Sequence, residues 1–153
     1  MDNPAEWIAS LIEGYCDTDE NDLGLVEGRI EPAWGTPLVA YASGADPIFA
    51  QYKEVVGPFH WTPLELFELA YPTESASPDE LTVIAWVLPQ TEATKRDNRR
   101  QRAYPAERWA RSRIMGEQFN NKLRAHVGQM LSEAGYPAVA PMLHPEWQSV
   151  RKR

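Results

Sequence analysis

The chain has a single cysteine among its 153 residues, Cys16. One cysteine can form no internal disulfide, and it cannot supply the roughly four ligands that a structural zinc or an iron–sulfur cluster needs. We therefore expect no cluster within this chain. Cys16 follows an apolar helix stripe, so we expect a packed or partly exposed thiol and not a reactive one.

Long hydrophobic runs and known catalytic motifs are also missing. No stretch approaches the ~20 apolar residues of a membrane span, and the N-terminus is acidic where a signal peptide needs bases. These absences predict a cytoplasmic protein with no membrane partner. There is no phosphate-binding Walker loop, no dinucleotide glycine fingerprint and no nucleophile elbow. The three histidines are far apart, so we expect no metal site and no complete catalytic site.

Basic residues are nearly absent from the first 94 residues, which hold 17 acids and only two bases, a net charge of −15. Residues 95–153 carry a net charge of +8, and the whole chain −7. Such a division favours an anionic partner for the second part. The alternatives are that the basic segment folds against the acidic first part or is a solvated helix face. Eight of the bases lie close together: Lys95, Arg96, Arg99, Arg100, Arg102, Arg108, Arg111 and Arg113.

Capping residues before proline predict three helices, which start at Asn3-Pro4, Asp46-Pro47 and Thr62-Pro63. A fourth and longest helix is expected from Pro105 to about Ala134, with two internal glycines that indicate close packing. Apolar runs predict strands at 37–43, 81–88 and 138–140, and the second reads as a buried central strand. We read residues 17–35 as a surface loop. This order predicts one α/β domain over 1–150, a layered sandwich with a central mixed sheet, and a charged tail over 151–153.

Two places could bind a ligand. The first follows the central strand at Pro89, Gln90 and Thr91, because ligands of α/β sheets bind beyond strand ends. The second is the basic segment with Tyr104 and Trp109, because arginine and aromatic side chains together can hold phosphates and stack bases. The anion-binding candidates are Arg96, Arg99, Arg100 and Arg102. A plain loop and a solvated helix entry are the respective alternatives.

An extended pattern covers the second half of the chain. It runs from VIAWVLPQT (83–91) through Asn98-Arg99, Tyr104-Pro105, Trp109-Ala110 and GEQFN (116–120) to GYPAVAPMLHPEW (135–147). With Pro47-Ile48-Phe49 and Leu64-Glu65-Leu66 upstream, it resembles the N-terminal half of the epoxyqueuosine reductase-like iron–sulfur proteins, over about residues 28–150. The resemblance implies a domain similar to the α/β domains of flavin reductases and cobalamin-processing proteins.

Members of that family hold a cobalamin in this domain and feed it electrons from a ferredoxin-like domain with two iron–sulfur clusters. The best-known members reduce a modified wobble base of tRNA. The resemblance would place a cobalamin against Pro89, Gln90, Thr91, Tyr104, Met142 and His144. The cysteine runs of the second domain are absent here, and residues 138–142 lack the acidic proton donor of the tRNA reductases. The chain ends after a strand and an apolar loop, as a truncated form of that fold would.

Three functions therefore stay open. The chain could be a cobalamin-binding domain of such a redox protein, acting as a reductase only when joined to an iron–sulfur partner. It could be an RNA- or protein-interaction module that uses the segment from Lys95 to Arg113. It could also be a flavin-dependent reductase-type domain. None of these readings gives the chain a catalytic residue of its own.

Overall fold

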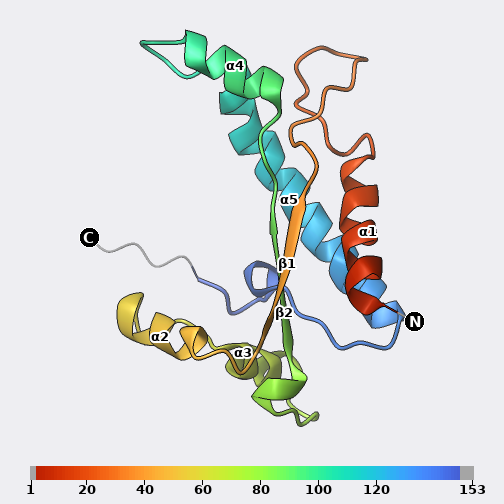
Figure 1. Cartoon of the computed structure of the whole chain (residues 1–153), viewed down its shortest axis with the longest axis vertical. Coiled ribbons are helices and arrows are strands. Elements are labelled where there is room, and N and C mark those ends of the chain that lie inside the picture. The colour runs from red at the N-terminus through yellow and green to blue at the C-terminus, as the bar shows by residue number, and fades with distance from the viewer. Residues whose placement is uncertain (1–2, 149–153) are drawn as a thin grey trace. The chain divides into compact units, whose positions relative to one another are not determined.

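The computed structural model describes residues 3–148 and shows a mixed α/β chain (Figure 1). The α/β class predicted from sequence is confirmed. Its helices and strands are α1 (Pro4–Cys16), β1 (Leu38–Ser43), α2 (Ile48–Val55), α3 (Pro63–Ala70), β2 (Thr82–Val87), α4 (Glu92–Arg100) and α5 (Glu107–Glu133), with short 3₁₀ helices η1 (Pro78–Glu80) and η2 (Pro141–Leu143).

The helix starts follow the local rules that predicted them. Asn3 caps α1 by accepting a hydrogen bond from the Glu6 backbone, and Pro4 takes the first helical position. Thr62 and Glu65 form a complete capping box at α3. The second and third helices and the long helix are therefore confirmed within one or two residues of their expected ends.

The sheet is smaller than expected. Among the described residues it has two strands, β1 and β2. They are antiparallel, because Gly44 bonds to Leu81 at one end and Gly35 to Pro89 at the other. The third strand predicted at 138–140 is wrong, since that segment has no regular structure. The layered sandwich with a mixed sheet is not seen here and stays a prediction.

The prediction of a buried central strand is also wrong for the described chain. β2 has one neighbour, and Val87 at its end is 60% exposed. The run at 81–88 was predicted to be buried because it is apolar on both faces. In the part of the chain that the structure describes, however, β2 has no second neighbouring strand. Both strands are therefore sheet edges.

The chain divides into two compact units, which together contain every element. Unit 1 comprises Met1–Val39 and Trp86–Val127, and unit 2 comprises Ala40–Ala85 and Gly128–Arg153. The single domain over 1–150 stays a prediction, and the tail at 151–153 lies outside the described residues.

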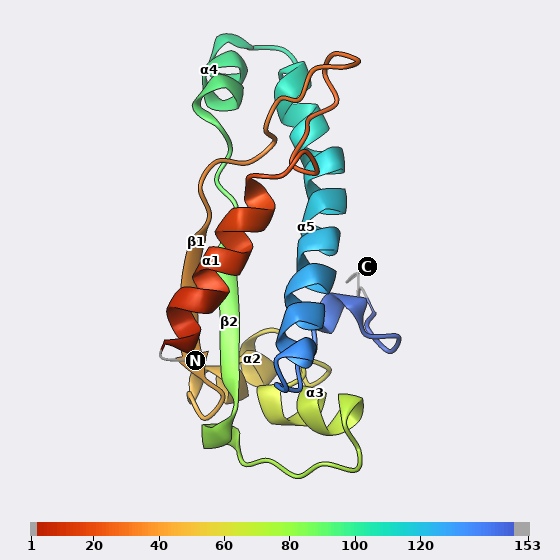
Figure 2. The same ribbon diagram turned by 90° about the vertical axis from the view of Figure 1, so that its right-hand side faces the viewer.

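Unit 1 has a distinct core between α1 and α5, which lie side by side in Figure 2. Ile12 and Leu123 are fully buried, and the ring of Tyr15 contacts both Phe119 and His126. The segment 17–35 is not only a surface loop, as the sequence suggested. Asn21 is buried in it, donates to the Cys16 and Trp34 carbonyls, and accepts from the Trp34 backbone N–H. This amide therefore joins the end of α1 to the approach to β1.

Candidate functional site

Helix α4 is the element that places the first part of the basic segment. Thr91 caps it, with its hydroxyl accepting from the Thr94 backbone N–H at 3.3 Å. Arg99 and Arg100 lie in the last turn, where cations complement the helix dipole. Thr94 is the one buried residue of the helix. An apolar stripe is therefore missing, which is why periodicity did not predict α4 and the threonine cap was its only signal.

The loop from α4 to α5 is held by one side chain. The Asn98 Oδ1 atom accepts from the backbone N–H of Ala106 at 3.1 Å, and Ala106 is buried. The intervening residues stay at the surface, and Tyr104 is 81% exposed. This arrangement presents Arg102 and Tyr104 on a loop that is anchored at both ends.

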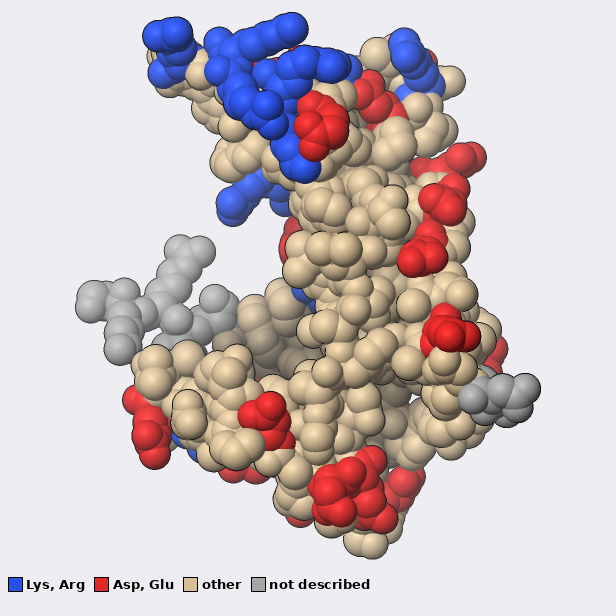
Figure 3. Space-filling view, viewed as in Figure 1, with Lys and Arg blue, Asp and Glu red and all other residues tan. Residues whose placement is uncertain are grey.

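We define the basic surface as the eight cationic side chains of α4, this loop and the first turns of α5. Figure 3 shows them gathered over α4 and the start of α5. The members are Lys95, Arg96, Arg99, Arg100, Arg102, Arg108, Arg111 and Arg113.

Some of these cations stabilise the fold. Arg108 is half-buried between the carboxylates of Glu31 and Asp97, with the Asp97 contact at 2.7 Å. Arg111 pairs with Glu107 at 2.9 Å and also donates to the carbonyl of Gly24. The charge of Arg108 is therefore neutralised within the chain, and Arg111 is held by its two contacts.

Lys95 and Arg99 share one carboxylate. Lys95 lies 2.8 Å from Glu92, and Arg99 lies 3.9 Å from the same group. The hydrogen bond from Lys95 holds the pKa of Glu92 below its ordinary value. Such exposed pairs contribute little to stability and exchange easily with other partners.

Four arginines keep their charge free. Arg96, Arg100, Arg102 and Arg113 contact no carboxylate within residues 3–148, and all four are exposed. The guanidinium carbon of Arg113 lies 5.5 Å from the centre of the Trp109 ring, a cation–π contact. The sequence-based candidates Arg96, Arg99, Arg100 and Arg102 are thus together on one surface, and the structure adds Arg113.

An open cavity of about 330 Å³ lies between the end of α4 and the start of α5. Its acids, Asp97 and Glu107, are paired with Arg108 and Arg111, which leaves Arg100 as its lining cation without a carboxylate partner. A polar cavity with one free guanidinium suits an anionic group. Its lining residues are Leu25, Asp97, Arg100, Gln101, Ala106, Glu107 and Arg108.

The cofactor candidates after β2 are used by the fold. The Gln90 amide nitrogen donates to the Ser112 hydroxyl at 3.0 Å, and the Pro89 carbonyl accepts from the Gly35 N–H at 2.8 Å. The hydroxyl of Thr91 binds both the backbone and the side chain of Thr94. These contacts use polar groups of all three residues within the fold, and the cobalamin site expected at Pro89, Gln90 and Thr91 stays a prediction.

The remaining cofactor candidates divide between the units. Tyr104 is in unit 1 with Pro89, Gln90 and Thr91, whereas Met142 and His144 are in unit 2. His144 lies edge-on to the Trp61 ring, with 5.9 Å between ring centres, and its Nδ1 accepts from the Glu146 N–H. The six residues therefore belong to two units, and their assembly into one cofactor site stays a prediction.

Other groups with chemical potential are buried or dispersed. Cys16 is buried, and burial raises the pKa of its thiol to about 11. Over residues 3–148, no cluster of histidine, cysteine and carboxylate side chains is placed to hold a metal. Within the same range, no helix is both long and apolar enough to cross a bilayer.

Comparison with known protein families, with curated proteins and with solved structures finds no match for this chain. Its resemblance to the epoxyqueuosine reductase-like proteins therefore remains a reading of the sequence. The basic surface with its adjoining cavity is the candidate site that the structure assembles from separate elements.

Proposed function

We propose that this chain binds RNA through its basic surface. The observation that carries the proposal is the group of four exposed arginines, Arg96, Arg100, Arg102 and Arg113, that contact no carboxylate in the described chain. Charges left free in an overall acidic chain favour an anionic partner. Guanidinium groups bind phosphate oxygens in pairs, which makes arginine suited to a nucleic-acid backbone.

The aromatic residues of the surface favour single-stranded RNA. Tyr104 is exposed on the loop, between Arg102 and Arg108 in the sequence. The ring of Trp109 lies against the guanidinium group of Arg113. Bases that are free of pairing can stack on such rings, whereas the bases of a duplex cannot. The cavity beside Arg100 has room for one phosphate or one base of a bound RNA strand.

The resemblance stated above points to the same partner. The best-known epoxyqueuosine reductase-like proteins act on tRNA, so a chain with that pattern would be the RNA-holding part of a tRNA-modifying redox protein. The described residues hold no iron–sulfur ligand set, and residues 138–142 offer no acid. We therefore assign the chain a binding role, with any reduction carried out together with an iron–sulfur partner.

The test is a fluorescence anisotropy titration of nuclease-treated protein with a labelled RNA stem-loop, at several salt concentrations. We expect affinity to fall steeply with salt, since phosphate contacts release counterions. The double variant Arg100→Glu, Arg102→Glu should bind at least about tenfold more weakly, with a salt slope lower by about two. Arg29→Glu is the matched control, because Arg29 is exposed and outside the basic surface. Binding that ignores both salt and the double variant would refute the proposal.

A cobalamin-binding domain is the second candidate. It is favoured by a contact between two parts of the resembling pattern, in which the Trp86 indole donates to the Asn120 side chain at 3.0 Å. The layered sandwich that the resemblance implies is part of this second candidate. The test is an absorbance titration with hydroxocobalamin. An unchanged corrin spectrum and an unchanged Tm of the protein at 100 µM hydroxocobalamin would exclude the cobalamin-binding domain. A yellow purified protein would instead favour the flavin-dependent reductase-type domain.

A further inference from the structure

Helix α2 of unit 2 is an amphipathic helix that leaves several apolar side chains uncovered in the described structure. None of its side chains is buried. Four apolar side chains of the helix and the turn after it are exposed, most of all Val55 at 82%. We call these four the α2 surface: Ile48, Val55, Val56 and Phe59.

The rest of unit 2 shows the same deficit of buried apolar area. Among its described residues, Leu66 and Leu131 are the two buried hydrophobic side chains, each 8% exposed. Exposed apolar groups of this kind mark surfaces that other molecules cover. The α2 surface is therefore a candidate docking surface, and the charges around it indicate what kind of partner would fit.

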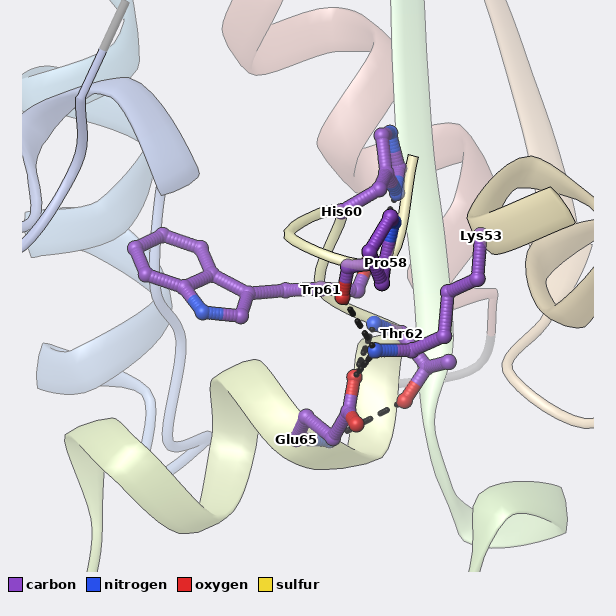
Figure 4. Close-up of polar contacts among 6 residues, drawn as sticks. All are labelled: Lys53, Pro58, His60, Trp61, Thr62 and Glu65. Carbon is purple, nitrogen blue, oxygen red and sulfur yellow. Dashed lines mark hydrogen bonds and ion pairs between the residues drawn. The ribbon is translucent and has the colours of Figure 1, made fainter. Parts of the chain in front are cut away.

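The charges around the α2 surface are acidic. Lys53, the one cation among the described residues of unit 2, is already used, because its ammonium group lies 2.9 Å from Glu65 and 3.3 Å from the Pro58 carbonyl (Figure 4). The exposed carboxylates of Asp46 and Glu54 flank the helix and form no ion pair in the described chain. A partner must therefore combine apolar side chains with free cations.

The basic surface has that composition. Arg102 is followed by the exposed ring of Tyr104, and Arg113 by Ile114, which is 65% exposed. The free arginines there would face the carboxylates beside α2. A second copy of the chain thus offers the complement that the α2 surface lacks, whereas two α2 surfaces facing each other would oppose acid to acid.

We propose that copies of this chain associate head to tail, with the α2 surface of one copy docked on the basic surface of the next. Such a contact is heterologous, so it joins different surfaces and builds rings or open chains. It does not depend on RNA binding, although the two partners would compete for the same arginines.

Sedimentation velocity on nuclease-treated protein tests this contact with two variants. Val55→Lys damages only the α2 surface, and Arg102→Glu damages only the basic surface. Both residues are exposed, so neither change disturbs the fold. We expect the wild type to form concentration-dependent assemblies that 0.5 M salt dissociates, and each variant alone to be monomeric. Leu38→Lys is the matched control and should assemble like the wild type, because Leu38 is an exposed apolar residue outside both surfaces.

An equimolar mixture of the two variants gives the deciding result. Each variant keeps one intact surface, so the mixture should form a 1:1 heterodimer and nothing larger. A mixture that stays monomeric, or a Val55→Lys variant that assembles as the wild type does, would overturn the proposal. Val55→Lys should leave RNA affinity within about twofold, since Val55 lies outside the basic surface. Failure of the head-to-tail contact is thereby distinguished from failure of RNA binding.

Discussion

The indole of Trp34 packs directly on the backbone of Gly116 in helix α5. A Cβ atom built on this glycine would lie 2.3 Å from Cζ2 of the indole, and the indole N–H donates to the Gly116 carbonyl at 3.3 Å. The close approach that the sequence predicted for Gly116 is confirmed. The same prediction is wrong for Gly128, where an added Cβ would meet nothing within 4 Å.

These two glycines should respond oppositely to alanine. Gly116→Ala should lower the free energy of unfolding by about 1–3 kcal/mol, because the new methyl group overlaps the Trp34 ring. Gly128→Ala should raise it by up to about 1 kcal/mol, because alanine is the better helix former and the site is open. Urea unfolding followed by circular dichroism measures both. Equal effects of the two substitutions would contradict the packing described here.

Cys16 should be unreactive in the folded protein. Burial, with smaller effects from Asp17 and Glu13, raises the pKa of its thiol from 9.0 to about 11. That rise lowers the thiolate fraction near neutral pH about 100-fold, and the thiolate is the reactive form. We expect a thiol reagent at pH 8 to label the native chain at least about 100-fold more slowly than the chain in 8 M urea. Rapid native labelling would show that the end of α1 opens.

Glu65 should make the stability of α3 depend on pH. The hydrogen bond from the Thr62 backbone, and then the contact with Lys53, hold the pKa of this carboxyl below its ordinary value of 4.5. A lowered carboxyl pKa stabilises the folded state above 4.5, and that contribution is lost as the pH falls through the folded-state pKa.

Glu65→Ala should therefore cost about 1 kcal/mol or less at pH 7, since the group is partly exposed, and the cost should shrink toward pH 3. Glu68→Ala on the same helix is the control and should stay within about 0.5 kcal/mol of the wild type at both pH values. Thermal unfolding at several pH values provides the comparison. A cost that does not change with pH would exclude the proposed role of the carboxylate.

The two units should differ in local stability. Within the described residues, nine hydrophobic side chains are buried in unit 1 and two in unit 2. Amides of α2 should therefore exchange with deuterium at least roughly tenfold faster than those around Phe119 and Leu123 of α5, because local opening costs less where fewer apolar contacts are lost. Hydrogen–deuterium exchange by mass spectrometry gives both rates, and equal protection would contradict the prediction.

Much of the helical structure follows from local chemistry that a sequence shows. Asn3, Thr62 and the prolines after them define helix starts whatever the rest of the chain does. Helix α4 was not predictable by periodicity, because it buries only Thr94 and its structure depends on contacts made by Thr91 and Asn98.

Strand pairing and ion pairs depend on residues far apart in the chain, so the sequence alone predicted them less well. The apolar run of β2 predicted a strand correctly but not how many neighbours it has, since that depends on other strands. The basic residues were predictable as a group. Which of them are free was not, because Glu31 neutralises Arg108 from 77 positions away in the chain.

The exposed apolar side chains of α2 also bear on the fate of a newly made copy. Until something covers Val55, Val56 and Phe59, the chain presents the apolar groups that chaperones and quality-control proteases recognise in unfinished proteins. Assembly would then set the lifetime of each copy. Because the partner is a second copy, the amount of this protein in a cell should accordingly rise more steeply than its rate of synthesis, since copies at low concentration stay unassembled and are degraded.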